Sequence, residues 1–102
     1  MRIIKIPFLV EAIRKHPKSR NWVENWAAVT RKTSWKNIQE VRATYPSADT
    51  VKAASGSNVV VFNVCGNDFR LITAIHYNRG IVYTLRFLTH AEYSKDLWKK
   101  EL

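Results

Sequence analysis

Three strand-like stretches separated by two short turns fill residues 58–88, and this pattern constrains the fold more than any other part of the chain. The stretches are N-V-V-V-F-N-V (58–64), F-R-L-I-T-A-I-H-Y (69–77) and I-V-Y-T-L-R-F-L (81–88). Gly66-Asn67 has the Gly-first pattern of a type II′ hairpin turn, and residues 78–80, Asn-Arg-Gly, suit a three-residue turn. The segment therefore predicts a three-stranded antiparallel meander.

Helical patterns fill the chain before this meander. A short strand at 2–6 is followed by a helix that begins with Pro7 and ends before Pro17, with Phe8, Ala12 and Ile13 as candidate buried residues. A second helix is predicted over about 19–31. Its apolar stripe of Trp22, Trp26 and Val29 favours core packing over a platform for stacking bases.

A third helix is predicted from a cap at Ser34 to about Thr44, where Pro46 stops it. Trp35, Ile38 and Val41 would face inward. Residues 45–58 are then expected to form a loop. Helices followed by an antiparallel sheet predict an α+β fold, in a single domain over 1–102 with N-terminal helices on a small sheet and a C-terminal helix.

The last strand runs into R-F-L-T-H-A-E-Y-S-K (86–95). Thr89 and Glu92 match a capping box, and Leu88 and Tyr93 stand at the two positions of a hydrophobic staple. A C-terminal helix is therefore predicted from His90 to about Glu101. Helix initiation explains neither Arg86 nor His90.

Side chains alternate between the two faces of a strand, so the strands can be sorted by face. The face covered by helices is expected to hold Val60, Phe62 and Val64; Phe69, Leu71, Thr73 and Ile75; Ile81, Tyr83, Leu85 and Phe87. The other face is mixed, and the turn lengths place its polar residues. Asn63 lies opposite Arg70, Arg70 lies opposite Leu88, and Arg86 lies one diagonal step away. His90 continues at the same end, whereas His76 lies at the opposite end.

Two neighbouring arginines repel each other, and that face of the strands has no carboxylate. This favours an anion site at Arg70 and Arg86. The nearest carboxylate that could instead pair with these arginines is Asp68, in the turn. The chain has 17 Lys and Arg against 8 Asp and Glu, a formal charge of +9. Such a balance is typical of proteins with a polyanionic partner, either nucleic acid or an acidic protein, although it can also serve solubility.

One cysteine, Cys65, excludes an internal disulfide and suits a reducing compartment. Three scattered histidines make no metal-binding pattern, and we expect neither a metal nor a cofactor. The N-terminal stretch is not a secretory signal, and no apolar stretch is long enough to span a bilayer. These features predict a soluble, cytoplasmic protein without membrane contact.

The stretches V-F-N-V-C-G-N-D-F-R-L-I-T-A-I-H-Y and I-V-Y-T-L-R-F-L-T-H-A-E-Y-S-K resemble the HigB-type toxins of the RelE/ParE superfamily. The Y-P-S-A-D segment at 45–49 is similar to a stretch of the same family, and the resemblance covers about 35–97. Its most specific part is T-H-x-E-Y after an R-F strand. Cys65 departs from the family pattern, which has glycine there.

The resemblance implies a RelE/ParE-like fold and an endoribonuclease that cleaves mRNA, typically in the translating ribosome. It also implies a HigA-type antitoxin with a helix-turn-helix domain. A metal-independent cleavage uses the 2′-hydroxyl as nucleophile on the adjacent phosphate, and needs a base, an acid and positive charge. Arg70 and Arg86 suit the phosphate. His90 is the acid or base candidate, because a helix N-terminus and two arginines favour its neutral form.

Tyr93 could donate a proton, stack on a base or serve only the staple. Asn63 could hold a phosphate or tie the turn, and Lys52 is a weaker candidate for RNA contact. The remaining candidates are basic residues in 14–20 and 31–36 that would contact ribosomal RNA or only be solvated: Arg14, Lys15, Lys18, Arg31 and Lys32. Two other readings stay open, a same-fold toxin that inhibits DNA gyrase by protein contact and a non-catalytic basic RNA-binding module.

Overall fold

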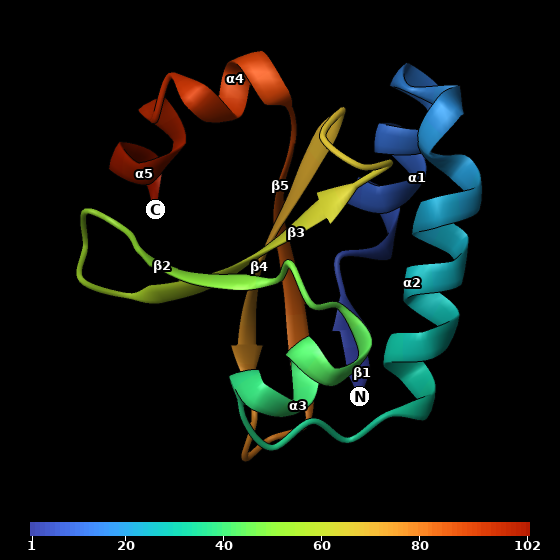
Figure 1. The fold of residues 1–102 in the computed structure, drawn as a ribbon, viewed down its shortest axis with the longest axis vertical. Helices are drawn as coiled ribbons and strands as arrows, with labels where there is room; N and C mark the ends of the chain where they lie inside the picture. The colour runs from blue at the N-terminus through green and yellow to red at the C-terminus, as the bar shows by residue number, and fades with distance from the viewer.

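The computed structural model describes residues 1–102 and contains one five-stranded sheet between two groups of helices (Figure 1). The strand order is β1-β5-β4-β3-β2. The strands are β1 (Arg2–Ile4), β2 (Asp49–Lys52), β3 (Asn58–Val64), β4 (Phe69–His76) and β5 (Ile81–Thr89). The helices are α1 (Ile6–Lys15), the short 3-10 helix η1 (Pro17–Ser19), α2 (Arg20–Lys32), α3 (Ile38–Thr44), α4 (His90–Ser94) and α5 (Leu97–Glu101). The expected α+β fold is confirmed.

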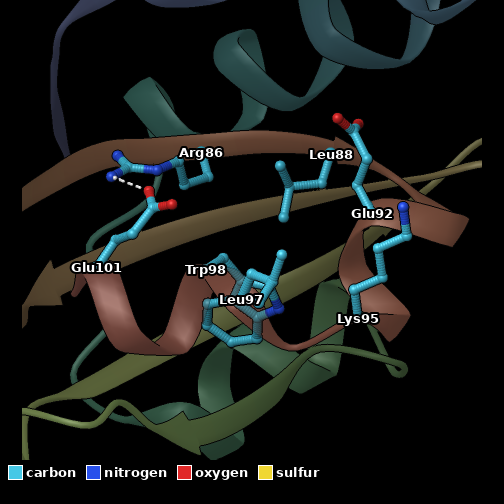
Figure 2. A pocket seen from close by; sticks show the side chains of 7 residues that line it. All are labelled: Arg86, Leu88, Glu92, Lys95, Leu97, Trp98 and Glu101. Atoms are coloured by element: carbon cyan, nitrogen blue, oxygen red, sulfur yellow. Dashed lines mark hydrogen bonds and ion pairs between the residues drawn. The ribbon is translucent and has the colours of Figure 1, made fainter.

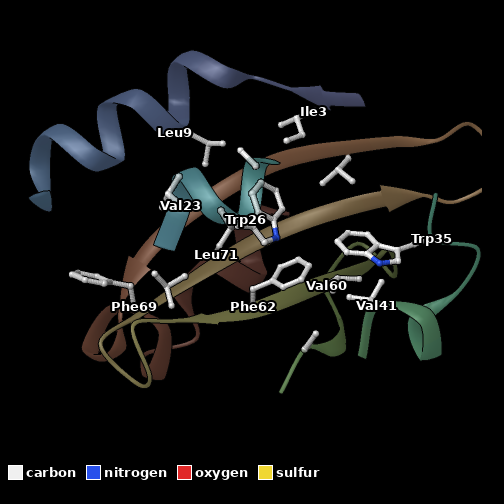
Figure 3. Packing of buried hydrophobic residues seen from close by; sticks show 14 residues of the cluster. Ile3, Leu9, Val23, Trp26, Trp35, Val41, Val60, Phe62, Phe69 and Leu71 are labelled. Atoms are coloured by element: carbon white, nitrogen blue, oxygen red, sulfur yellow. The ribbon is translucent and has the colours of Figure 1, made fainter. Parts of the chain in front are cut away.

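The larger core lies between the sheet and α1, α2 and α3 (Figure 3). Trp26 of α2 is fully buried and packs edge-on against Phe62 of β3, with ring centroids 5.5 Å apart. Trp22 is half-buried and stacks on Trp26, so both tryptophans belong to the core as expected. The buried positions of α2 are, however, Val23, Trp26, Ala27 and Thr30.

A smaller core lies on the other face of the sheet, where α4 and α5 cover it. Trp98 of α5 is buried against Val59, Val61 and Ile72. The two faces of the sheet are therefore both covered, one by the N-terminal helices and one by the C-terminal helices. None of the helices is long and apolar enough to cross a bilayer.

The meander forms as expected, with one shift of register. His76 pairs with Ile81, so the second turn spans four residues and not three. A β-bulge at Leu85 then restores the expected pairing of Arg70 with Leu88. As a result Val82 and Thr84, and not Ile81, Tyr83 and Leu85, join the face covered by the N-terminal helices. The buried Thr84 hydroxyl donates to the carbonyl oxygens of Ile4 and Lys5, each at 3.2 Å.

Two further expectations about the middle of the chain are wrong. Residues 49–52, expected within a loop, form edge strand β2, which pairs antiparallel with β3. Only Val51 in that stretch is apolar, so it lacks the alternation that marks a strand. The third helix begins at Ile38 and not after Ser34, because Asn37 caps it by accepting from the Glu40 amide at 3.0 Å.

The expected single C-terminal helix is divided into α4 and α5. Asp96 has φ of 60°, in the left-handed region, and ends the first helix. The turn brings Trp98 back over the sheet, where its indole N–H donates to the Tyr93 carbonyl at 3.1 Å. Burial of Trp98 on the smaller core thus outweighs the helical continuity that the pattern indicates.

Candidate active site

The turn between β3 and β4 holds one end of the candidate site. Cys65 and Gly66 both have positive φ, 53° and 71°, and the Asp68 amide donates to the Cys65 carbonyl at 3.4 Å. The backbone at Cys65 thus has a conformation that glycine adopts without strain, and glycine is the residue that the resemblance leads us to expect there. The Asp68 carbonyl accepts from the His90 amide at 3.0 Å, so the turn fixes the start of α4 beside the start of β4.

Asp68 is not the structural partner of Arg70, contrary to expectation. Its carboxylate pairs with Lys18 of η1, which raises the pKa of the Lys18 ammonium through the hydrogen bond and the charge attraction. Lys18 therefore lies at the same end of the molecule as the turn and α4. Because both side chains are largely exposed, this pair adds little to stability.

Arg70 is the centre of the site. The residue is 8% exposed, and its guanidinium donates to three acceptors: the Phe69 carbonyl at 3.0 Å, the Asn67 side-chain oxygen at 3.2 Å and His90 Nδ1 at 3.3 Å. Its guanidinium carbon also lies 5.3 Å from the centre of the Tyr93 ring. A guanidinium can only donate, so Nδ1 of His90 is the acceptor, and a neutral ring carries its proton on Nε2.

Helix α4 presents His90 and Tyr93 to this arginine. The predicted capping box is present: the Thr89 hydroxyl accepts from the Glu92 amide at 3.2 Å, and the Glu92 carboxylate accepts from the Thr89 amide at 2.9 Å. Tyr93 also stacks on Trp98, with ring centroids 5.3 Å apart and planes 16° from parallel. Tyr93 is therefore held between the Arg70 guanidinium and a buried indole.

Arg86 shares a sheet face with Arg70, as expected, because it pairs with Ile72 across the strands. Its guanidinium, however, is directed along the pocket toward α5 and away from α4 (Figure 2). It donates to the Leu85 carbonyl at 2.7 Å and to the Glu101 carboxylate at 3.1 Å. The strands carry no carboxylate on this face, but α5 brings one, so the expected excess of positive charge at Arg86 is neutralised.

The other predicted residues lie at varied distances from this cluster. Asn63 is the cross-strand neighbour of Arg70. Lys52 lies on edge strand β2, two strands from Arg70. Arg14 bonds to Glu11 at 3.0 Å near the end of α1, whereas Arg31 and Lys32 end α2 at the opposite end of the molecule from α4 (Figure 1).

Sequence reasoning missed three residues of the site, namely Asn67, Trp98 and Glu101. Asn67 stands in a recognised turn, but turn residues are common and the pattern does not say which side chain points at Arg70. Trp98 and Glu101 reach the sheet only because the chain turns at Asp96, which no helical pattern indicates. No three His, Cys, Asp or Glu side chains gather anywhere in the structure.

The α+β order of elements is compatible with a RelE-like toxin domain, and in this chain it places an Arg-His-Tyr cluster where the C-terminal helices begin. The chain belongs to the HigB toxin family, whose family model, described as the RelE-like toxic component of a toxin–antitoxin system, matches residues 19–96. It is 27% identical over 93 residues to the mRNA interferase toxin HigB of Escherichia coli K12, covering 91% of this chain and 88% of that protein. It is 29% identical over 93 residues, 91% and 87% of the two chains, to the mRNA interferase HigB of Escherichia coli O6:H1.

Proposed function

We propose that this protein is the mRNA-cleaving toxin of a toxin–antitoxin pair, acting as a single-domain endoribonuclease. The family and the names of its relatives support this activity. The contact between Arg70 and His90 is the observation that carries the chemistry, because it joins a phosphate-binding group to a proton-transfer group. Roles for individual residues follow from that contact.

His90 acts as the general base through Nδ1. Bound RNA offers its phosphate to Arg70, whose Nη2 leaves His90 Nδ1 and donates to phosphate oxygens. The free Nδ1 then takes the proton of the 2′-hydroxyl as that oxygen bonds to phosphorus. The bond from phosphorus to the 5′-oxygen breaks, leaving a 2′,3′-cyclic phosphate.

Tyr93 donates the proton that the 5′-oxygen needs, and Arg70 holds its ring in place. Arg86 is a second phosphate ligand once it exchanges Glu101 for RNA. Asn63 contacts the RNA beside Arg70, and Lys52 does so from β2. Proton transfer and charge stabilisation thus come from side chains alone, with no metal or cofactor.

The substrate is mRNA in the translating ribosome, and the site of action is the cytoplasm. Lys15 and Lys18 contact ribosomal RNA, because they lie at the same end of the molecule as the site. Arg14 is adjacent to them, but its guanidinium is bonded to Glu11. The antitoxin that neutralises this toxin is of the HigA type, with a helix-turn-helix domain.

Inhibition of DNA gyrase by protein contact is the rival function for this fold. That activity requires no proton transfer and gives no reason for an Arg70 guanidinium held against His90 and Tyr93. A non-catalytic RNA-binding module explains the charge of +9 but not the buried cluster.

Expression of the protein followed by primer-extension mapping of cellular mRNA separates these functions. Discrete 5′ ends within translated regions are expected for the parent protein and not for His90→Ala. DNA breaks that depend on gyrase, with intact mRNA, would instead establish the rival.

A further inference from the structure

The pocket between β5 and α5 has a volume of about 290 Å³ and lies beside the Arg70 cluster. Leu88, Leu97 and Trp98 form its apolar part. The pair of Arg86 and Glu101 closes one end, and Glu92 and Lys95 line the other (Figure 2). Leu97 is 57% exposed, one of two large apolar side chains in the protein that are this open. A planar ring could therefore bury apolar surface here without displacing any core residue.

The charged end of the pocket suits a phosphate. A carboxylate and a phosphate present similar oxygen atoms to a guanidinium, so Glu101 occupies the position that an RNA phosphate would take on Arg86. Arg86 keeps its bond to the Leu85 carbonyl at 2.7 Å, which fixes the guanidinium while the other nitrogen exchanges partners. The Glu101 side chain is 60% exposed, and such ion pairs contribute little to stability, so its displacement costs little.

The sheet brings the two arginines close enough for neighbouring phosphates of one RNA strand. Arg70 pairs with Leu88, and Arg86 is the diagonal neighbour two residues earlier, a separation of roughly 7–8 Å between backbone positions. The apolar part includes Leu88, which lies directly across from Arg70 and two residues after Arg86 on β5. A base and a phosphate of the same nucleotide can thus occupy the two halves of the pocket.

We propose, resting on the proposed ribonuclease function, that this pocket binds the nucleotide adjacent to the scissile phosphate. Its base packs on Leu88, Leu97 and Trp98, and its phosphate replaces Glu101 on Arg86. Glu101 is then a built-in competitor that holds Arg86 in the free protein and is released by RNA. The subsite borders the Arg70 cluster, where the reaction occurs, and shares Trp98 with it through the stacked Tyr93 ring.

The test measures, by fluorescence anisotropy, how tightly the protein binds a short single-stranded 2′-O-methyl RNA. This RNA offers no 2′-hydroxyl for cleavage. Glu101→Gln removes the competing charge and is expected to bind this RNA about two- to fivefold more tightly than the parent. Asp49→Asn is the matched control, because it removes one carboxylate from an exposed ion pair with Arg42 at another place. It is expected to bind like the parent.

The apolar half is tested with Leu97→Ser, which is expected to weaken binding about three- to tenfold through lost apolar contact. Val10→Ser, at the other open apolar side chain, serves as its control on α1. Addition of the RNA should also shift the methyl NMR signals of Leu97 in the parent. Circular dichroism of each variant establishes that the fold is retained.

Equal affinities of the Glu101→Gln and Asp49→Asn variants for the RNA would overturn the subsite. Unchanged binding by Leu97→Ser, together with unshifted Leu97 methyl signals in the parent, would overturn it as well. Either result leaves the ribonuclease proposal standing if the parent still cuts mRNA. A parent protein that cuts no mRNA in cells removes the proposed function, and the subsite with it.

Discussion

Arg70 is a charged residue at a nearly buried position, and its contacts explain why it is tolerated there. Burying an unpaired charge is costly, but this guanidinium donates to two backbone or amide oxygens and to His90, and faces the Tyr93 ring. The same contacts orient His90 and Tyr93. One residue thus links the turn, β4 and α4 into a single cluster.

At this scale the decisive prediction concerns His90. His90→Ala is expected to lower mRNA cleavage by about 10²–10⁴-fold, because the general base is lost, while the fold remains. Growth arrest on induction and primer extension measure the effect, with the melting temperature as control. Full toxicity of His90→Ala together with inactivity of Tyr93→Phe would assign proton transfer to the tyrosine; toxicity of both would favour gyrase inhibition.

Tyr45 provides a stability prediction at the same scale. Its hydroxyl is buried among aromatic rings without a hydrogen-bond partner, and burial raises the pKa of Tyr45 above 10.0. Tyr45→Phe removes the unpaired hydroxyl and is expected to raise the free energy of unfolding by about 1 kcal/mol.

The pH dependence has a defined sign. As pH rises above 10.0, the unfolded chain loses the Tyr45 proton before the folded chain does, which lowers the free energy of unfolding. The Tyr45→Phe variant has no such proton, so its free energy of unfolding should fall less over this pH range. Chemical denaturation at pH 7 and above pH 10 measures both the gain in stability and its pH dependence. Tyr77→Phe is the control for the gain at pH 7, because that hydroxyl is not buried without a partner. Burial also raises the pKa of Tyr77, so both variants should lose less stability above pH 10. Equal gains at pH 7 in the two variants would contradict the prediction.

At the scale of elements, the site depends on how α4 begins. The capping box fixes the first turn of a five-residue helix that carries both His90 and Tyr93. The β-bulge at Leu85 lies in the middle of β5, where it returns Arg86 to the face of Arg70. Both features position side chains without touching the substrate.

Thr89→Ala is expected to lower the free energy of unfolding by about 1 kcal/mol through the lost cap. Cleavage should also fall, because His90 and Tyr93 lose their fixed orientation, although no reacting group is removed. Chemical denaturation and a cleavage assay measure the two effects. Ser94→Ala, in the same helix and bonded only to the His90 carbonyl, is the control; if both variants behave alike, the cap does not position the site.

At the scale of the molecule, the sheet divides the protein into two halves with different tasks. The N-terminal helices cover the larger core, whereas α4 and α5 cover the smaller core and carry or border the site. Basic residues occur at both ends of α2, but only one end adjoins the site (Figure 1). Ribosome contact is therefore expected to be uneven over the surface.

Two double variants of equal charge change test this asymmetry. Lys15→Glu with Lys18→Glu is expected to weaken ribosome association more than Arg31→Glu with Lys32→Glu, because fewer phosphates are neutralised beside the site. Cosedimentation with ribosomes over a range of salt concentrations measures both, and the parent's association should fall steeply with salt. Equal losses in the two variants would mean that the basic surface acts only through net charge.

The sequence alone determined the meander, the pairing of Arg70 with Asn63, the capping box and the α+β class, because each depends on contacts between residues near in sequence or on a period of two. The shared face of Arg70 and Arg86 agrees with the prediction only because the longer turn and the bulge offset each other. The bulge itself was not predictable, since an extra residue leaves no mark on an apolar pattern and changes the face of every residue before it in the strand.

Only the tertiary structure decided what surrounds the two arginines. Glu101 reaches Arg86, and Trp98 reaches Tyr93, because α5 turns back at Asp96 to bury an indole on the second face of the sheet. Lys18 reaches Asp68 because η1 packs beside the β3–β4 turn. Such contacts join segments far apart in the chain, and they are set by packing of the whole core, which no local pattern encodes.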